Sequence, residues 1–152
     1  MQRVNSRRGM QGVSLIEVLV SVVIIAIGLL GIAAMQSMAL RGGQSSLESS
    51  QAVMQTQSIL ESMRANRANV AAYATGGRVC DPATVASANA LAQADLRNWL
   101  ASLKSNIGTI NDATTCGQIA VNGTGTWTVT VQWDDDRAGG GSARTVVTET
   151  RI

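Results

Sequence analysis

Three groups of residues in this sequence could do chemistry: one carboxylate inside an apolar run, two cysteines, and three consecutive aspartates. They are Glu17; Cys80 and Cys116; and Asp134, Asp135 and Asp136. The chain has no histidine, so it lacks the commonest general base and metal ligand, and it cannot build a Ser-His-Asp or Cys-His site. Two cysteines cannot complete a structural zinc site alone. We therefore expect neither an enzyme nor a bound cofactor.

The three aspartates could bind a hard cation such as Ca²⁺, because such cations take carboxylate oxygens as ligands. A calcium loop of the EF-hand type spaces its ligands at alternate positions, whereas Asp134, Asp135 and Asp136 are adjacent. The stretch DDDRAGGGSA is more typical of a solvated turn, with an aspartate paired to Arg137. We therefore expect a hairpin tip and no metal.

The positive charge of the chain is concentrated at its start. The sequence has 12 basic and 10 acidic residues, a formal charge of +2. Arg3, Arg7 and Arg8 precede Gly12, and without them the balance is 9 basic against 10 acidic, or −1. No basic stripe suited to a phosphate backbone is left. We therefore expect no nucleic-acid partner.

The stretch from Val18 to Leu40 contains no charged residue over 23 positions. A helix of about 20 residues crosses a hydrocarbon core roughly 30 Å thick, so this stretch can span a membrane. Three arginines precede the stretch and only Arg41 closely follows it, and the positive-inside rule then places Met1 in the cytoplasm. The rest of the chain is expected outside, in an oxidising compartment.

A removable signal peptide is the alternative for this stretch. It would have a shorter apolar core followed by a small-residue cleavage site, which Ala33-Ala34 could imitate. Glu17 and a helical pattern that continues beyond Arg41 fit that alternative less well.

The short sequence from Gly12 to Glu17, GVSLIE, resembles the processing site of type IV prepilins. The resemblance implies that a prepilin peptidase cleaves after Gly12 and that the new amine, on Val13, is methylated. It also implies that residues 1–12 are a leader, that residues 13–40 form the membrane and assembly half of a long helix, and that residues 41–152 form a periplasmic pilin-like domain.

Later stretches are similar to one branch of this family, the minor pilins called PilV or type IV pilus modification proteins. They are LESMRANRANVAAY, DLRNWLASL and VTVQWDDDR. This similarity implies a structural subunit that primes pilus assembly near the tip and supports twitching motility and surface attachment. Its partners would be other minor pilins, the major pilin and the processing peptidase. It would reside in the bacterial inner membrane and, after assembly, in the extracellular pilus.

Two other functions remain open. A minor pseudopilin of a type II secretion system would share the fold and the processing, and the proteins that co-purify with it would distinguish the two. A membrane-anchored periplasmic binding protein is a candidate of another class.

Glu17 has a physical explanation if the chain is cut after Gly12. An ionisable group at a membrane helix centre costs roughly 2.5–3.5 kcal/mol on insertion scales and usually has a partner. Val13 would then carry a cationic amine four residues before Glu17, on the same helix face. The carboxylate could pair with that amine or with the amine of a neighbouring subunit, which would set the register between apolar helices. The simpler alternative is that Glu17 only complements the helix N-terminus.

Periodic apolar residues predict two helices beyond the membrane stretch. The long helix is expected to continue, with a bend at Gly42-Gly43, to near Tyr73, and a second helix is expected from Ser87 to Ser105. The expected apolar face of the first is Leu47, Val53, Met54, Ile59, Leu60 and Met63, with Ser45, Glu48, Gln55, Gln57 and Glu61 on other faces. The expected apolar face of the second is Leu91, Leu96, Trp99, Leu100 and Leu103.

The C-terminal part predicts a small antiparallel sheet. A short strand is expected over 118–121, and a returning strand over 144–151. Between them Trp127, Val129, Val131 and Trp133 alternate with polar residues, a period of two whose apolar side should pack on the long helix. The fold class expected is α+β, a pilin-like lollipop.

A disulfide is expected between Cys80 and Cys116, because the compartment is oxidising and there is no third cysteine. It would enclose the second helix, and a closed loop of this size contributes about 3 to 4 kcal/mol in the chain-entropy account.

Overall fold

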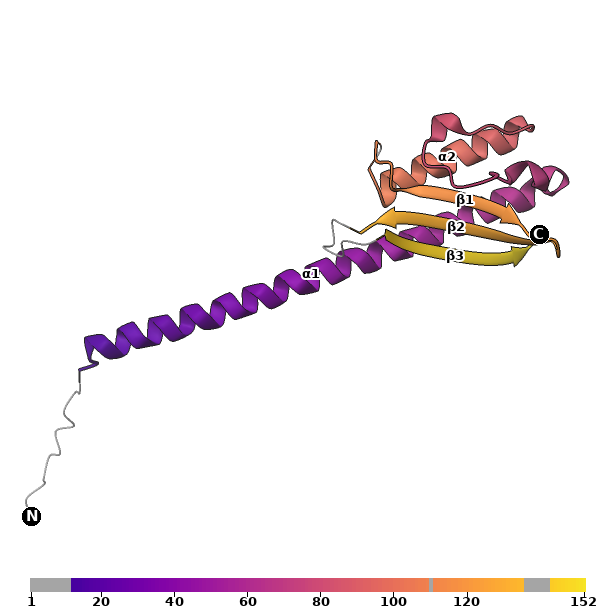
Figure 1. The fold of residues 1–152 in the computed structure, drawn as a ribbon. Coiled ribbons are helices and arrows are strands. Elements are labelled where there is room, and N and C mark those ends of the chain that lie inside the picture. Colours follow the sequence, from indigo (N-terminus) through magenta and orange to yellow (C-terminus); the bar gives the residue numbers. More distant parts are fainter. Residues whose placement is uncertain (1–11, 110, 136–142) are drawn as a thin grey trace, which may run out of the picture. The chain divides into compact units, whose positions relative to one another are not determined.

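The computed structural model describes residues 12–109, 111–135 and 143–152. Its elements are two α-helices, two short 3₁₀ segments and three strands (Figure 1). They are α1 (Leu15–Ala65), η1 (Arg67–Tyr73), η2 (Pro82–Thr84), α2 (Ala90–Asn106), β1 (Cys116–Val121), β2 (Thr126–Asp134) and β3 (Ala143–Arg151). The chain divides into two compact units between Ala39 and Leu40. The predicted α+β class is confirmed.

The first unit contains the apolar part of α1. Every residue from 12 to 44 is exposed to solvent, including the large apolar side chains of Leu29 and Leu30 at 61% and 71%. Within the described ranges, α1 is the one helix long and apolar enough to cross a membrane by length and composition. A helix that is apolar all round needs an apolar environment on every side.

The second unit begins with the remaining turns of α1. The helix continues through Gly42 and Gly43 without interruption and ends at Ala65, not near Tyr73. The segment η1 carries the chain on to Tyr73 in the tighter 3₁₀ form. The sequence therefore predicted the end of the long helix too late, because it included the separate segment η1.

The buried face of α1 differs in part from the one predicted. It consists of Glu48, Ala52, Thr56, Ile59, Leu60 and Met63. Leu47, Val53 and Met54 were expected on this face but are 56%, 46% and 54% exposed. The prediction was wrong here because it followed the large apolar residues. The three- and four-residue spacing of the buried face instead includes the small side chains Ala52 and Thr56.

Helix α2 begins at its N-cap Asn89, whose side chain accepts a hydrogen bond from the Ala92 backbone N–H at 3.0 Å. Its buried apolar face is Ala92, Leu96, Trp99, Leu100 and Leu103. Leu91 was predicted on this face but is 56% exposed, and Ala92 takes its place.

The sheet has the order β1-β2-β3, with antiparallel pairs throughout. Along β2 the side chains of Trp127, Val129, Val131 and Trp133 are buried, as the period of two predicted. At Gly117 in β1 a β-carbon would lie 2.5 Å from the ring of Trp99, so only glycine allows this close approach of strand to helix.

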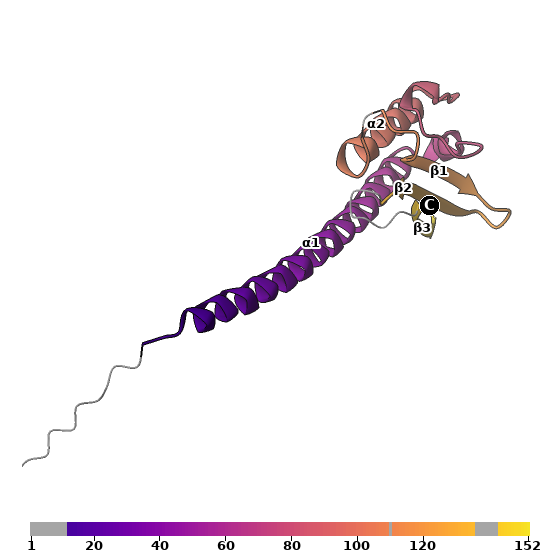
Figure 2. The same ribbon diagram turned by 60° about the vertical axis from the view of Figure 1, so that its left-hand side comes forward.

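One hydrophobic core joins the sheet, α2 and residues 40–65 of α1, which lie side by side in Figures 1 and 2. It includes Ile59, Leu60 and Met63 from α1, Trp99 and Leu100 from α2, and the inner row of β2. The indole N–H of Trp99 also donates to the Gln55 backbone carbonyl at 3.1 Å. The core therefore holds the C-terminal turns of α1 against the sheet and α2.

Candidate processing and assembly site

Gly12 and Val13 lie in non-helical chain just before α1. Val13 is 70% exposed, and a β-carbon at Gly12 would meet nothing within 4 Å. Gly12 is also not among the described glycines with a positive φ. The fold itself therefore does not require glycine at position 12, and an exposed, non-helical segment of this kind is accessible to an enzyme.

Glu17 lies in the first turn of α1. The Ser14 carbonyl accepts the N–H groups of Glu17 and Val18, at 3.0 and 3.3 Å. No hydrogen bond or ion pair of the Glu17 carboxylate is found within the described ranges. In this uncut chain the helix starts at Leu15, so Val13 is not yet on the same helical face as Glu17. The carboxylate is placed where it complements the positive end of the helix.

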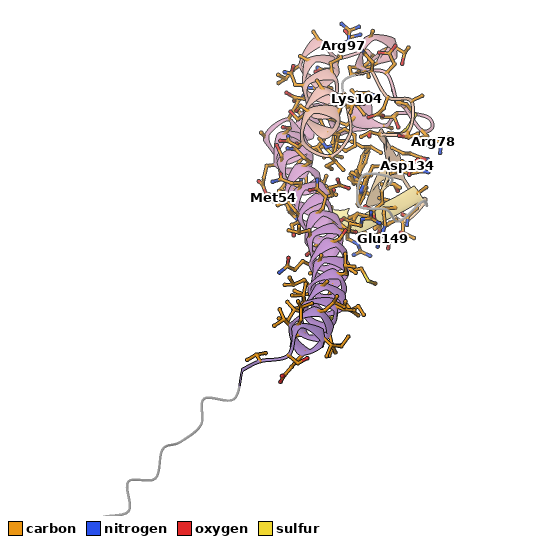
Figure 3. All side chains as sticks on the ribbon, turned by 90° about the vertical axis from the view of Figure 1, so that its left-hand side faces the viewer. Met54, Arg78, Arg97, Lys104, Asp134 and Glu149 are labelled. Atoms are coloured by element: carbon orange, nitrogen blue, oxygen red, sulfur yellow. A yellow bond between two sulfur atoms is a disulfide. The ribbon has the colours of Figure 1, made fainter. Side chains whose placement is uncertain are left out.

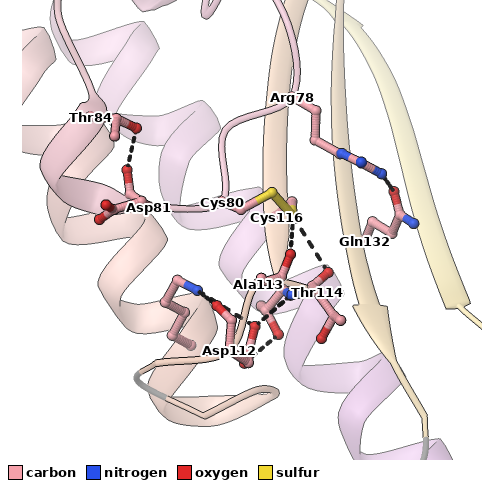
Figure 4. The surroundings of a disulfide bond; sticks show 11 residues. Arg78, Cys80, Asp81, Thr84, Asp112, Ala113, Thr114, Cys116 and Gln132 are labelled. Carbon is pink, nitrogen blue, oxygen red and sulfur yellow. Dashed lines mark hydrogen bonds and ion pairs between the residues drawn. A yellow bond between two sulfur atoms is a disulfide. The ribbon is translucent and has the colours of Figure 1, made fainter.

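The disulfide predicted between Cys80 and Cys116 is present, with a sequence separation of 36 (Figure 4). Beside it, Val79 and Gly117 exchange two backbone hydrogen bonds of 2.8 Å. The preceding residue, Arg78, donates to the Gln132 side chain at 2.8 Å. The disulfide therefore joins the loop after η1 to the start of β1.

Asp112 organises the loop that precedes Cys116 (Figure 4). Its carboxylate accepts the backbone N–H groups of Thr109, Thr114 and Thr115, the Thr115 hydroxyl, and the nearby Lys104 ammonium at 3.5 Å. Burial raises the pKa of Asp112, but the hydrogen bonds from Thr109 and Thr115 and the charge of Lys104 outweigh it and lower the pKa to about 2. This network was not visible in the sequence, since a lone aspartate in a polar loop has no distinguishing pattern.

Lys104 is almost fully buried, and a hollow of about 300 Å³ lies next to it. Cys80, Asp81, Pro82, Asn111, Asp112 and Ala113 complete its lining. Because Lys104 and Asp112 are already bonded to each other, the hollow offers no unpaired charge from this pair to a ligand. It therefore adds little support to the binding-protein alternative.

Two side chains join the sheet to the part of α1 around Ser45 and Glu48, and both were misjudged from the sequence. Asp135 was expected at a solvated tip but is fully buried. It accepts hydrogen bonds from the Ser45 hydroxyl and the Arg144 guanidinium, both at 2.9 Å. Glu48 was expected on a polar face but is 3% exposed and accepts the indole N–H of Trp133 at 3.2 Å.

The structure describes two of the three consecutive aspartates, Asp134 and Asp135. No group of three or more metal-ligating His, Cys, Asp or Glu side chains occurs in the part of the chain that the structure describes. Asp134 and Asp135 are neighbours on a strand and its end, where successive side chains point to opposite faces. Asp136 and the expected pairing with Arg137 lie outside the described residues.

Comparison with known protein families gives one match. Residues 7–33 match the family described as the Prokaryotic N-terminal methylation motif. No curated protein and no solved structure matches the chain significantly. The matched segment contains the Gly12-Val13 junction, Glu17 and most of the apolar helix. The match supports a type IV pilin or a type II secretion pseudopilin. Proteins of both groups are structural, anchored in a membrane and processed by a prepilin peptidase.

Proposed function

We propose that this chain is a minor pilin of the PilV branch, a structural subunit that primes type IV pilus assembly and lies near the pilus tip. The observation that carries the proposal is the methylation motif at residues 7–33, placed on an exposed junction that leads directly into an apolar helix. In this role the chain would support twitching motility and surface attachment. Other minor pilins and the major pilin would be its partners.

Processing would remove residues 1–12 and leave Val13 as a methylated N-terminus. Residues 13–40 would anchor the chain in the inner membrane, with residues 41–152 in the periplasm until assembly. The exposed positions of Gly12 and Val13 are consistent with cleavage by a peptidase. The disulfide is consistent with an oxidising compartment for the domain.

Glu17 would act in assembly through the new amine of Val13. In the uncut chain Val13 precedes the helix, so the pairing becomes available only once residues 1–12 are gone and the helix can extend to the new N-terminus. Either this amine or the amine of a neighbouring subunit would neutralise the carboxylate in a medium of low dielectric constant.

A minor pseudopilin of a type II secretion system is the second candidate, because the matched motif is common to both groups. The two candidates differ in the proteins with which the chain assembles. Recovery of the full chain with sheared surface pili supports the first, and recovery only with secretion-system components supports the second.

Mass spectrometry of the full chain from cells that contain a prepilin peptidase tests the processing. The expected N-terminus is N-methylated Val13. Gly12→Val should leave residues 1–12 attached, whereas Gly28→Ala, at a glycine that also has open space around it, should be processed normally. A mature N-terminus after Ala33-Ala34 would overturn the proposal.

A further inference from the structure

The sheet has two edges, and one of them is covered by the chain itself. Outside β1, the segment 75–79 forms backbone hydrogen bonds with the strand. Val79 and Gly117 exchange two bonds of 2.8 Å, and the Thr75 N–H donates to the Ile119 carbonyl at 3.0 Å. The Ile119 N–H in turn donates to the Thr75 hydroxyl at 3.1 Å. This edge of the sheet is therefore closed.

The edge formed by β3 has no such cover among the described residues. All nine residues of β3 pair with β2, and no other described segment pairs with the opposite side of β3. Alternate backbone N–H and C=O groups on that side point away from the sheet. A row of such groups is a template for a further strand.

The β3 edge lacks two of the devices that usually block pairing, a bulge and a proline, and its exposed charges, Glu149 and Arg151, lie towards its C-terminal end. Its register with β2 is unbroken over nine residue pairs, so it has no bulge, and it contains neither proline nor glycine. Its centre, Thr145 to Thr148, is uncharged and β-branched, and Val147 is 57% exposed. The one charge on its inner face, Arg144, is bound to Asp135.

The inner side of β3 is only partly covered. Val146, Thr148 and Thr150 are half-buried. Their partners across the pair, Val131, Val129 and Trp127, are buried. A strand added beyond β3 would cover the remaining surface of these side chains while it satisfied the free backbone groups.

We propose that the outer edge of β3 docks an extended segment of a neighbouring pilin-type subunit. This rests on the function proposed above. An extended chain matches a row of free backbone donors and acceptors. Opposite Val147, that chain would carry an apolar or β-branched residue, and it would contain no proline. Because both subunits are anchored in one membrane, their high effective concentration lets a contact of this modest size suffice.

A second copy of this chain is the less suitable occupant. If two copies paired their β3 edges about a two-fold axis to form one continuous sheet, the two β3 strands would run antiparallel. In Figure 1, β3 runs in the same general direction as residues 40–65 of α1. Such a pair would set residues 40–65 of the two α1 helices antiparallel to each other, whereas under the proposed function neighbouring subunits enter a filament with these residues in the same direction.

Photo-crosslinking of the full chain in its own cells tests the proposal. A photoreactive amino acid replaces Val147, and Val121 at the end of β1, 47% exposed, is the matched control position. The expected result is a product at position 147 that joins the chain to a different subunit bearing a prepilin-type N-terminus, through a peptide in an extended segment. Position 121 should give no such product.

A charge at the edge gives a second, quantitative readout. Val147→Lys should lower the amount of the chain in sheared filaments roughly fivefold, from the loss of one cross-strand pair and an added edge charge, whereas Val121→Lys should not. Fluorescence of the buried tryptophans checks that both variants fold.

The outcomes separate the two proposals. Equal incorporation of the two lysine variants, or a crosslink at position 147 only to a second copy, overturns the edge proposal and leaves the proposed function standing. Absence of the unmodified chain from filaments and from secretion complexes overturns the proposed function, and the edge proposal with it.

Discussion

The two halves of α1 show how one continuous helix meets two environments. From residue 15 to residue 44 every side chain is exposed, and the large apolar ones point in all directions. From residue 45 to residue 65 a single face is buried, and the opposite side carries polar residues with Leu47 and Met54. The protein core therefore explains the sequence of the second half, whereas only an apolar surrounding outside the chain explains the first.

The comparison also separates two carboxylates of the same helix. Glu48 lies in the domain, is 3% exposed and receives the Trp133 indole N–H. Glu17 lies at the start of the apolar half and is exposed. One carboxylate is used inside the fold, whereas the other is exposed and, under the proposed function, would pair with the amine that processing creates on Val13.

Matched leucine substitutions should separate the two halves most strongly. Leu60→Ala removes a side chain that is 1% exposed in the core, whereas Leu29→Ala changes one that is 61% exposed. Leu60→Ala should lower the free energy of unfolding of the domain by about 2–5 kcal/mol, and Leu29→Ala by less than about 0.5 kcal/mol. Urea unfolding of the full chain in detergent, followed by tryptophan fluorescence, measures this.

Tryptophan fluorescence suits this comparison because Trp99, Trp127 and Trp133 are all buried in the domain and none lies in the apolar half. A loss from Leu29→Ala as large as that from Leu60→Ala would mean that the apolar half packs on the domain, against the division into two units.

Removal of the disulfide should act on the domain alone. The double variant Cys80→Ser/Cys116→Ser opens a loop with a sequence separation of 36. The free energy of unfolding should fall by about 3–4 kcal/mol if the effect is the entropy of the unfolded chain. Cleavage after Gly12, read by mass spectrometry, should be unchanged. Impaired cleavage in a folded variant would contradict the independence of the two regions.

How far the sequence predicted the structure depends on the type of residue. The alternation in β2 was predicted correctly because Trp127 to Trp133 combine a strict period of two with large side chains. The face of α1 was predicted only in part, because Ala52 and Thr56 carry no strong signal although they are fully buried. Asp135 was misplaced because its burial depends on Ser45, 90 residues away in sequence. Such long-range polar contacts leave no local periodicity.

Substitution of the two carboxylates should give opposite phenotypes. Glu48→Ala leaves the buried indole N–H of Trp133 without this acceptor, and should lower the free energy of unfolding by about 1–3 kcal/mol. Glu17→Ala should leave domain stability and cleavage unchanged but reduce the amount of the chain in sheared filaments. Unfolding curves and immunoblots of filament fractions measure the two effects. Normal incorporation of Glu17→Ala would count against the pairing with the Val13 amine.

The smallest expected effect is the response of the domain to acid. The pKa of Asp112 is lowered from 3.8 to about 2 in the folded chain, so its contribution to stability is complete above pH 4 and is lost as the pH falls towards 2. With discount for partial exposure, about 1–2 kcal/mol should disappear over this interval. Asp112→Asn should remove this part of the pH dependence, while Asp81→Asn, at an exposed N-cap in the same region, serves as the matched control. If Asp112→Asn kept the full acid response, Asp112 would not be its source, and the loop beside the disulfide would not be the acid-sensitive part of the domain.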